Sequence, residues 1–125
     1  MKDGRCGVLV VDDDPDILEI VTFFLRLHDV RVVTACDGVE ALELLRKSDD
    51  VGLVLLDLMM PRMSGADVLR EIRRDPALGA TPIVVISGNR DCESTAAALG
   101  ANGWLLKPVD IDDLKRVVGR YVPLP

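Results

Sequence analysis

The stretch VLVVDDDP, residues 8–15, places four apolar residues directly before three consecutive aspartates. An uninterrupted apolar run is typical of a strand that is covered on both faces of a sheet. Neighbouring carboxylates repel one another by about 1 kcal/mol at ~4 Å in water, and by roughly four times as much in a partly buried site. The strand therefore ends either in a solvated loop or at a site where a cation compensates the charges.

Four further apolar runs follow, and a helical pattern separates each from the next. The five expected strands cover residues 8–11, 30–35, 53–56, 83–86 and 104–106. Arg31 and Thr34 dilute the second run, so we expect it at an edge of the sheet. Strand and helix alternate five times, which predicts an α/β domain whose parallel sheet lies between two layers of helices.

The expected helices have recognisable starts, most of them at side chains that are typical N-caps. Pro15 fits the first helical position, and Asp37 with Glu40 resembles a capping box for a helix through Lys47. A short helix over residues 91–99 should stop at Gly100. The caps that we expect for the other three helices are Asp14, Ser64 (for a helix through about Arg74) and Asp110.

Two helices carry apolar stripes at helical spacing, which predict their buried faces. For the first helix the stripe is Ile17, Ile20, Val21, Phe24 and Leu25. For the last helix it is Ile111, Leu114, Val118 and Tyr121.

Composition and charge narrow the class of protein. The chain has 125 residues, is 49% apolar and 29% charged, and carries a formal charge of −6. These values fit one globular domain over residues 1–125, with a structured core from about 6 to 121 and a tail or linker start at 122–125. The acidic balance argues against a nucleic-acid surface, and no apolar stretch approaches the ~18 residues of a membrane span.

The cysteines and the N-terminus predict a cytoplasmic protein. Cys6, Cys36 and Cys92 are odd in number and form no CxxC pair, which favours reduced thiols. We expect Cys92 to be the most accessible of them. The N-terminal residues lack the apolar segment of a signal peptide.

The ends of the expected strands carry a specific set of polar residues. In open α/β sheets, ligands bind outside the carboxyl ends of the strands. The first strand ends in Asp12, Asp13 and Asp14, and the others end in Asp57, Ser87 and Lys107. Carboxylates without His or Cys partners favour Mg²⁺. Mg²⁺ and Lys107 would together balance Asp12, Asp13 and Asp57, so Asp57 is the natural nucleophile for a phosphoryl group.

Four motifs in this order make the chain resemble a receiver domain of a two-component response regulator, over essentially its whole length. They are VLVVDDDPDILEIV (8–21), LVLLDLMMPRMSG (53–65), PIVVISG (82–88) and GANGWLLKP (100–108). The resemblance implies a flavodoxin-like, doubly wound (βα)5 fold with the strand order 2-1-3-4-5. It further implies a phosphorylation-dependent signalling switch that catalyses only its own phosphotransfer and dephosphorylation.

The resemblance also assigns roles to residues. Asp57 would accept the phosphoryl group from a sensor histidine kinase or a histidine phosphotransfer protein. Mg²⁺ would be bound by Asp13 directly, by Asp12 mainly through water, by Asp57 and by the main-chain carbonyl of Met59. Lys107 would pair with the phosphoryl group, and its bond to Pro108 would be cis. The residues of the switch would be Ser87 and Trp104.

The output surface implied by the resemblance is formed by the fourth helix, fifth strand and fifth helix, which would contact an output domain or target protein. Neither nucleic acid nor membrane is expected as a direct partner. The stretch GANGW lacks the acidic pair that is often found there in receivers that dimerise through this face. We therefore do not expect that mode of dimerisation.

Three alternatives remain at this point. In a second register, Asp13 and Asp14 would be the metal pair, which would leave the first helix without its cap. A small Mg²⁺-dependent phosphatase of the haloacid-dehalogenase type would use Asp12 with Asp14, although Asp16 stands where that motif has Thr or Val. A pseudo-receiver would bind partners without phosphorylation, but neither an acid nor the lysine is missing.

Overall fold

The computed structural model describes residues 7–124, in which five strands alternate with five helices. All strand pairs are parallel, and the order across the sheet is β2-β1-β3-β4-β5, which confirms the expected order. The elements are β1 (Gly7–Val11), α1 (Pro15–Leu27), β2 (Val32–Ala35), α2 (Gly38–Lys47), β3 (Val51–Asp57), α3 (Gly65–Arg74), β4 (Ile83–Ser87), α4 (Cys92–Leu99), β5 (Gly103–Leu106) and α5 (Ile111–Val118).

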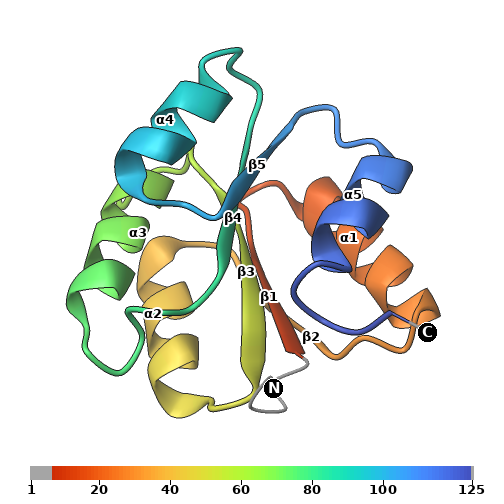
Figure 1. The fold of residues 1–125 in the computed structure, drawn as a ribbon, viewed down its shortest axis with the longest axis horizontal. Coiled ribbons are helices and arrows are strands. Elements are labelled where there is room, and N and C mark those ends of the chain that lie inside the picture. The colour runs from red at the N-terminus through yellow and green to blue at the C-terminus, as the bar shows by residue number, and fades with distance from the viewer. Residues whose placement is uncertain (1–6, 125) are drawn as a thin grey trace.

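The sheet lies between two layers of helices (Figure 1), with α2, α3 and α4 on one face and α1 and α5 on the other. Successive residues of β1 alternate between the two cores: Leu9 and Val11 pack on the first face, and Val8 and Val10 pack on the second. Because both faces are covered, a continuous apolar run suits the strand, whereas an alternating pattern would not.

The edge strand and the switch point follow from the strand order. β2 lies at one edge, as expected, and its Val33 and Thr34 are exposed. β1 pairs with β2 on one side and with β3 on the other. The connections change direction between β1 and β3, so their carboxyl ends form the switch point where ligands bind in such sheets.

The helix caps are those that the sequence predicts. Oδ1 of Asp14 accepts the N–H of Asp16 at 2.9 Å, and Oγ of Ser64 accepts the N–H of Asp67 at 3.2 Å. The carboxylates of Asp37 and Asp110 cap α2 and α5 in the same way. Gly100 ends α4 with a φ of 81°, a left-handed conformation that glycine adopts without steric cost.

The capping box of α2 differs in one detail. Asp37 accepts the N–H of Glu40 at 2.9 Å, but the carboxylate of Glu40 accepts the N–H of Cys36 at 2.8 Å and not that of Asp37. The reciprocal bond therefore reaches one residue further back than in the standard motif.

The predicted buried faces of α1 and α5 are partly wrong. Ile20 is 55% exposed and Ile111 is 43% exposed, whereas Val117 is buried although the predicted stripe left it out. Both helices lie on the same face of the sheet (Figure 1), and within residues 7–124 no further helix or strand covers them, so their outer flanks meet solvent. Tyr121 is half-buried beyond the end of α5, and Val122 is buried, so packing reaches past residue 121.

The expected accessibility of the cysteines is reversed. Cys92 is 1% exposed at the start of α4, and burial raises the pKa of its thiol. Cys36 is the exposed one, and Cys6 lies outside the described residues. Across residues 7–124, every helix is too short or too polar to cross a bilayer.

Candidate functional site

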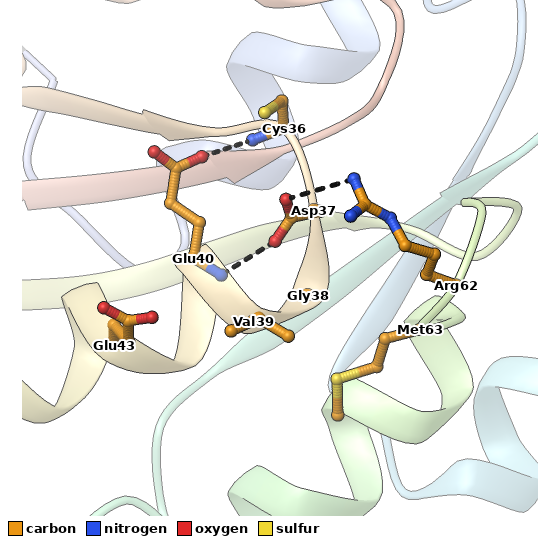
Figure 2. Close-up of a pocket in the computed structure, with 8 residues that line it drawn as sticks. All are labelled: Cys36, Asp37, Gly38, Val39, Glu40, Glu43, Arg62 and Met63. Carbon is orange, nitrogen blue, oxygen red and sulfur yellow. Dashed lines mark hydrogen bonds and ion pairs between the residues drawn. The ribbon is translucent and has the colours of Figure 1, made fainter.

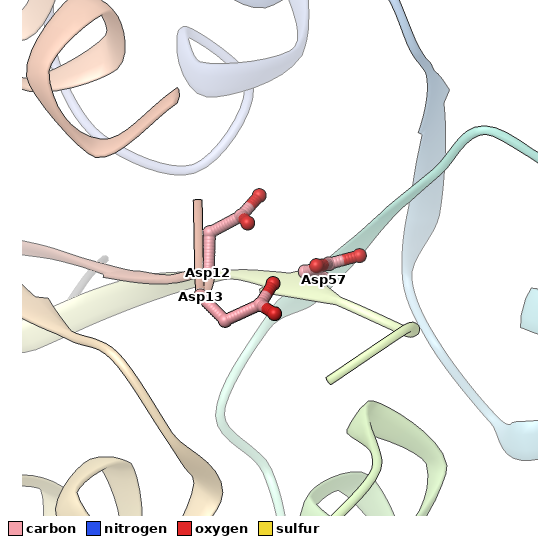
Figure 3. Close-up of side chains that lie close together, drawn as sticks. All are labelled: Asp12, Asp13 and Asp57. Atoms are coloured by element: carbon pink, nitrogen blue, oxygen red, sulfur yellow. The ribbon is translucent and has the colours of Figure 1, made fainter. Parts of the chain in front are cut away.

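Three carboxylates lie together at the carboxyl ends of β1 and β3 (Figure 3). Asp12 directly follows β1 and is fully buried, Asp57 is the last residue of β3 and is 2% exposed, and Asp13 is exposed. One oxygen from each side chain lies within 4.8 Å of the others. The structure thus brings these three acids together, while the carboxylate of Asp14 caps α1 instead.

Lys107 brings one positive charge to these carboxylates. Its Nζ lies 3.1 Å from Oδ2 of Asp12 and 3.6 Å from Oδ2 of Asp57. The residue follows β5, and its main-chain N–H donates to the carbonyl of Ser87 at 2.8 Å. The bond from Lys107 to Pro108 is cis, as expected. The ends of β1, β3, β4 and β5 therefore meet at one site.

Main-chain donors hold the two buried carboxylates in place. Oδ1 of Asp12 accepts the N–H of Asp14 at 2.9 Å, and Oδ1 of Asp57 accepts the N–H of Met59 at 3.1 Å. Both bonds join a carboxylate to the residue two places ahead, which orients the side chain at the point where the strand ends. In both cases Oδ2 is the oxygen that faces Lys107.

The buried charges shift the acidities of these groups. Burial, together with the nearby charge of Asp12, raises the pKa of Asp57 to about 6 and outweighs the lowering effects of the Met59 N–H and of Lys107. Burial alone would lower the pKa of Lys107, but its interactions with Asp12 and Asp57 raise it above its usual value. At neutral pH Asp57 is therefore ionised and Lys107 is protonated.

The charge balance of the site fits a divalent cation. Three ionised carboxylates face one ammonium, which leaves two negative charges uncompensated. Apart from the ion pair with Lys107, the buried Oδ2 of Asp12 accepts no hydrogen bond from residues 7–124. Oxygen ligands of this kind suit Mg²⁺, so the residues present fit a bound Mg²⁺ ion.

The other predicted residues, Ser87, Met59 and Trp104, differ in how deeply they are buried. Ser87 ends β4 and is 1% exposed, and its Oγ accepts the N–H of Asn89 at 3.1 Å. Met59 engages Asp57 through its main chain, and its side chain is 71% exposed. Trp104 pairs with Val85 in the sheet and is 40% exposed, so its indole lies at the surface of β5.

The sequence analysis missed the role of Gly65. This residue begins α3, and its N–H donates to the carbonyl of Leu58 at 3.2 Å. A Cβ added here would lie 2.7 Å from Cα of Leu58 and 2.9 Å from the carbonyl carbon of Asp57. The start of α3 thus packs directly on the backbone of Asp57 and Leu58. A glycine at the first position of a helix, right after a Ser cap, was the available signal.

A hollow of about 440 Å³ lies beside the loop that follows Asp57 (Figure 2). Arg62 in this loop has a φ of 67°, and its guanidinium lies 4.0 Å from Oδ2 of Asp37. Cys36 also lines the hollow, and its hydrogen-bonded neighbour Glu40 raises the pKa of the thiol. The contact between Arg62 and Asp37 ties the loop after Asp57 to the start of α2.

The chain belongs to the response regulator receiver domain family, whose model matches residues 8–119. It is similar to the two-component response regulator ORR12 of Oryza sativa subsp. japonica, with 37% identity over 113 residues that cover 89% of this chain and 93% of that protein. It is also 36% identical to a probable cyclic di-GMP phosphodiesterase of Vibrio cholerae. That match covers 95% of this chain but only 27% of that protein.

Solved structures show the same fold. A response regulator receiver protein from Pseudomonas putida superposes with a TM-score of 0.86 at 35% identity, covering 95% of this chain and 99% of that one. The chemotaxis protein CheY4 of Vibrio cholerae superposes with a TM-score of 0.85 at 30% identity, covering 94% and 99%. The family match gives no support to a haloacid-dehalogenase-type phosphatase.

Proposed function

We propose that Asp57 accepts a phosphoryl group from the phosphohistidine of a sensor histidine kinase or histidine phosphotransfer protein. The observation that carries this proposal is the position of Lys107, whose Nζ lies between the buried carboxylates of Asp12 and Asp57 at the switch point of the sheet. An ammonium there is placed to meet the oxygens of a phosphoryl group that arrives at Asp57.

The reaction forms one bond and breaks another. A carboxylate oxygen of Asp57 attacks the phosphorus and the P–N bond of the phosphohistidine breaks, with its electron pair staying on the ring nitrogen. That ring takes up a proton from solvent, so the products are an acyl phosphate and a neutral imidazole. Asp57 is ionised at neutral pH, so it needs no general base. Lys107 pairs with the phosphoryl oxygens, and the Ser87 hydroxyl donates a hydrogen bond to one of them. Water later hydrolyses the acyl phosphate, and no other substrate is turned over.

Asp12, Asp13, Asp57 and the main-chain carbonyl of Met59 would hold Mg²⁺. The ion would neutralise the charge of the phosphoryl oxygens. The residues of this chain supply what else the site requires: the N–H of Met59 orients the carboxylate of Asp57, and the N–H of Asp14 orients that of Asp12. Asp14 itself stays on the helix cap, which favours Asp12 and Asp13 as the metal pair.

Phosphorylation would be transmitted through Ser87 and Trp104 to the surface of α4, β5 and α5. The hydrogen bond from the Lys107 N–H to the Ser87 carbonyl couples the ends of β4 and β5, which supports this route. An output domain or target protein would bind there. We further propose that the chain is a single receiver domain that acts in the cytoplasm, where it would meet the phosphodonor domain of its kinase.

Phosphorylation by a small-molecule donor tests the proposal. Incubation with acetyl phosphate and Mg²⁺ should add one phosphoryl group to the wild type, measured by intact mass, and chelation of Mg²⁺ should prevent it. Asp57→Asn should abolish the adduct. Asp14→Asn is the matched control, because asparagine keeps the cap, and it should still be phosphorylated. An equal adduct on Asp57→Asn, or its loss in Asp14→Asn alone, would overturn the assignment.

A further inference from the structure

The outer flank of α1 carries a cluster of exposed apolar side chains. Phe23 and Leu27 are each 65% exposed, Ile20 is 55% exposed, and Ile111 at the start of α5 is 43% exposed. All four line one hollow of about 410 Å³ between α1 and α5, the two helices that cover the same face of the sheet in Figure 1. Apolar residues gathered on one surface, with charged residues at the margin, are typical of protein interaction sites.

Phe23, which is 65% exposed, lines this hollow on one side. On its other side it borders a second hollow, which is lined by Leu18, Thr22 and Thr34 at the β2 edge. The exposed ring of Phe23 therefore lies between two hollows, one of which is lined mainly by apolar side chains. A two-fold interface requires this combination, because each copy must offer both the projection and the recess that receives it.

The spacing of the exposed residues along α1 fits pairing with another helix. Ile20, Phe23 and Leu27 follow one another at intervals of three and four, which is the seam of a two-helix coiled coil. Glu19 and Arg26 immediately precede Ile20 and Leu27, so they lie on the same flank of the seam, seven residues apart. Within residues 7–124 neither of them forms an ion pair.

The signs of these two charges select the direction of pairing. In an antiparallel pair, the flank that carries Glu19 and Arg26 faces the same flank of the second helix, and the second helix runs in the opposite direction. Glu19 of one copy then meets Arg26 of the other, and two symmetry-related ion pairs form. In a parallel pair, this flank would instead face the other flank of the second helix, which carries the buried residues of α1. The flank is thus complementary to itself only in the antiparallel arrangement.

We propose that this chain forms a two-fold homodimer through antiparallel α1 helices, with Phe23 of each copy inserted in the α1–α5 hollow of the other. The interface uses one short helix and the start of another, so it is small, and the dimer is a weak, concentration-dependent one. It differs from the α4–β5–α5 face expected for contacts with an output partner, and it does not depend on phosphorylation of Asp57.

Sedimentation velocity of the unphosphorylated protein, from micromolar to sub-millimolar concentration, tests the proposal. The wild type should show a monomer–dimer equilibrium, and Phe23→Glu should remain monomeric throughout. Val39→Glu is the matched control, because Val39 is 58% exposed on α2, on the opposite face of the sheet; it should dimerise as the wild type does. Both substitutions are at exposed positions, and circular dichroism verifies that the variants fold.

Charge reversal tests the antiparallel arrangement itself. Glu19→Arg and Arg26→Glu should each weaken the dimer by about tenfold, because two attractive contacts become repulsive. The double variant should recover the wild-type affinity, and an equimolar mixture of the two single variants should form a heterodimer. A wild type that stays monomeric would overturn the proposal and leave the surface to a different protein. Dimers that Leu106→Glu disrupts and Phe23→Glu does not would overturn it as well.

Discussion

Nζ of Lys107 lies 3.1 Å from Oδ2 of Asp12, whose side chain is completely buried. The lysine follows β5 and the aspartate follows β1, so the side chain of Lys107 spans from one edge of the sheet towards its centre. On the way it also lies 3.6 Å from Asp57. One cation is thus shared by two buried carboxylates, which otherwise repel each other.

Lys107→Met should destabilise the metal-free fold because it leaves two buried carboxylates without their cation. We expect the free energy of unfolding, measured by urea titration in EDTA at neutral pH, to fall by about 1–3 kcal/mol. The loss should be smaller when Asp57→Asn is already present. Lys115→Met, at an exposed position on α5, should change stability by about 0.5 kcal/mol or less. Equal losses in both backgrounds would contradict the shared-cation interpretation.

Asp57→Asn should stabilise the metal-free protein in a pH-dependent way. Burial raises the pKa of Asp57 to about 6 in the folded state, so between about 4 and 6 the folded protein binds more protons than the unfolded chain. Asp57 therefore destabilises the fold increasingly as pH rises through this window. Above pH 6 we expect the variant to be more stable by about 2–3 kcal/mol, at ~1.4 kcal/mol per pH unit.

The difference between Asp57→Asn and wild type should shrink as pH falls from about 6 towards 4. Thermal or urea unfolding in EDTA across this range measures it. The exposed Asp49→Asn variant serves as the reference for a carboxylate-to-amide change outside the site. If the wild type were as stable as Asp57→Asn at pH 7.5, the buried carboxylate of Asp57 would not lower the free energy of unfolding, and the prediction would be wrong.

Gly65→Ala should displace the start of α3 from the backbone of Asp57. The new Cβ would lie 2.7 Å from Cα of Leu58, a main-chain atom that cannot rotate away. We expect a loss of about 1–3 kcal/mol, together with slower phosphorylation by acetyl phosphate. Gly88→Ala provides the comparison, since a Cβ there has no atom within 4 Å. Normal stability of Gly65→Ala would mean that the α3 start moves freely.

Arg73→Lys should weaken the contacts between α3 and the segments that precede β4 and β5. The guanidinium donates to the carbonyls of Gly79, Thr81 and Gly100 and to the side chain of Asn102, at 2.8–3.2 Å. The ammonium of lysine cannot donate hydrogen bonds in the planar arrangement of a guanidinium. We therefore expect the free energy of unfolding in urea to fall by about 1–3 kcal/mol. Arg70→Lys, at an exposed position on the same helix, should be nearly neutral.

Strand order and helix packing could not be predicted from short stretches of sequence alone. Capping bonds join residues two or three places apart, so the side chains of Asp14 and Ser64 were sufficient to predict where α1 and α3 begin. The pairing of β1 with β3 is non-local, and it was expected only because the chain resembles a known family. The exposure of Ile20 and Ile111 depends on what covers their helices, which helical periodicity does not report.

Short stretches of sequence were enough to predict the βα alternation and the polar residues at each strand end, because apolar runs and caps act over a few residues. The acids that end β1 and β3, the serine that ends β4 and the lysine after β5 could all be assigned to one edge of the sheet on these grounds. Which of their atoms form ion pairs could not be predicted in this way, because it depends on the packing of the whole domain. The reach of Lys107 to Asp12 and Asp57, the close approach of Gly65 and the open flank of α1 all depend on how distant segments pack together.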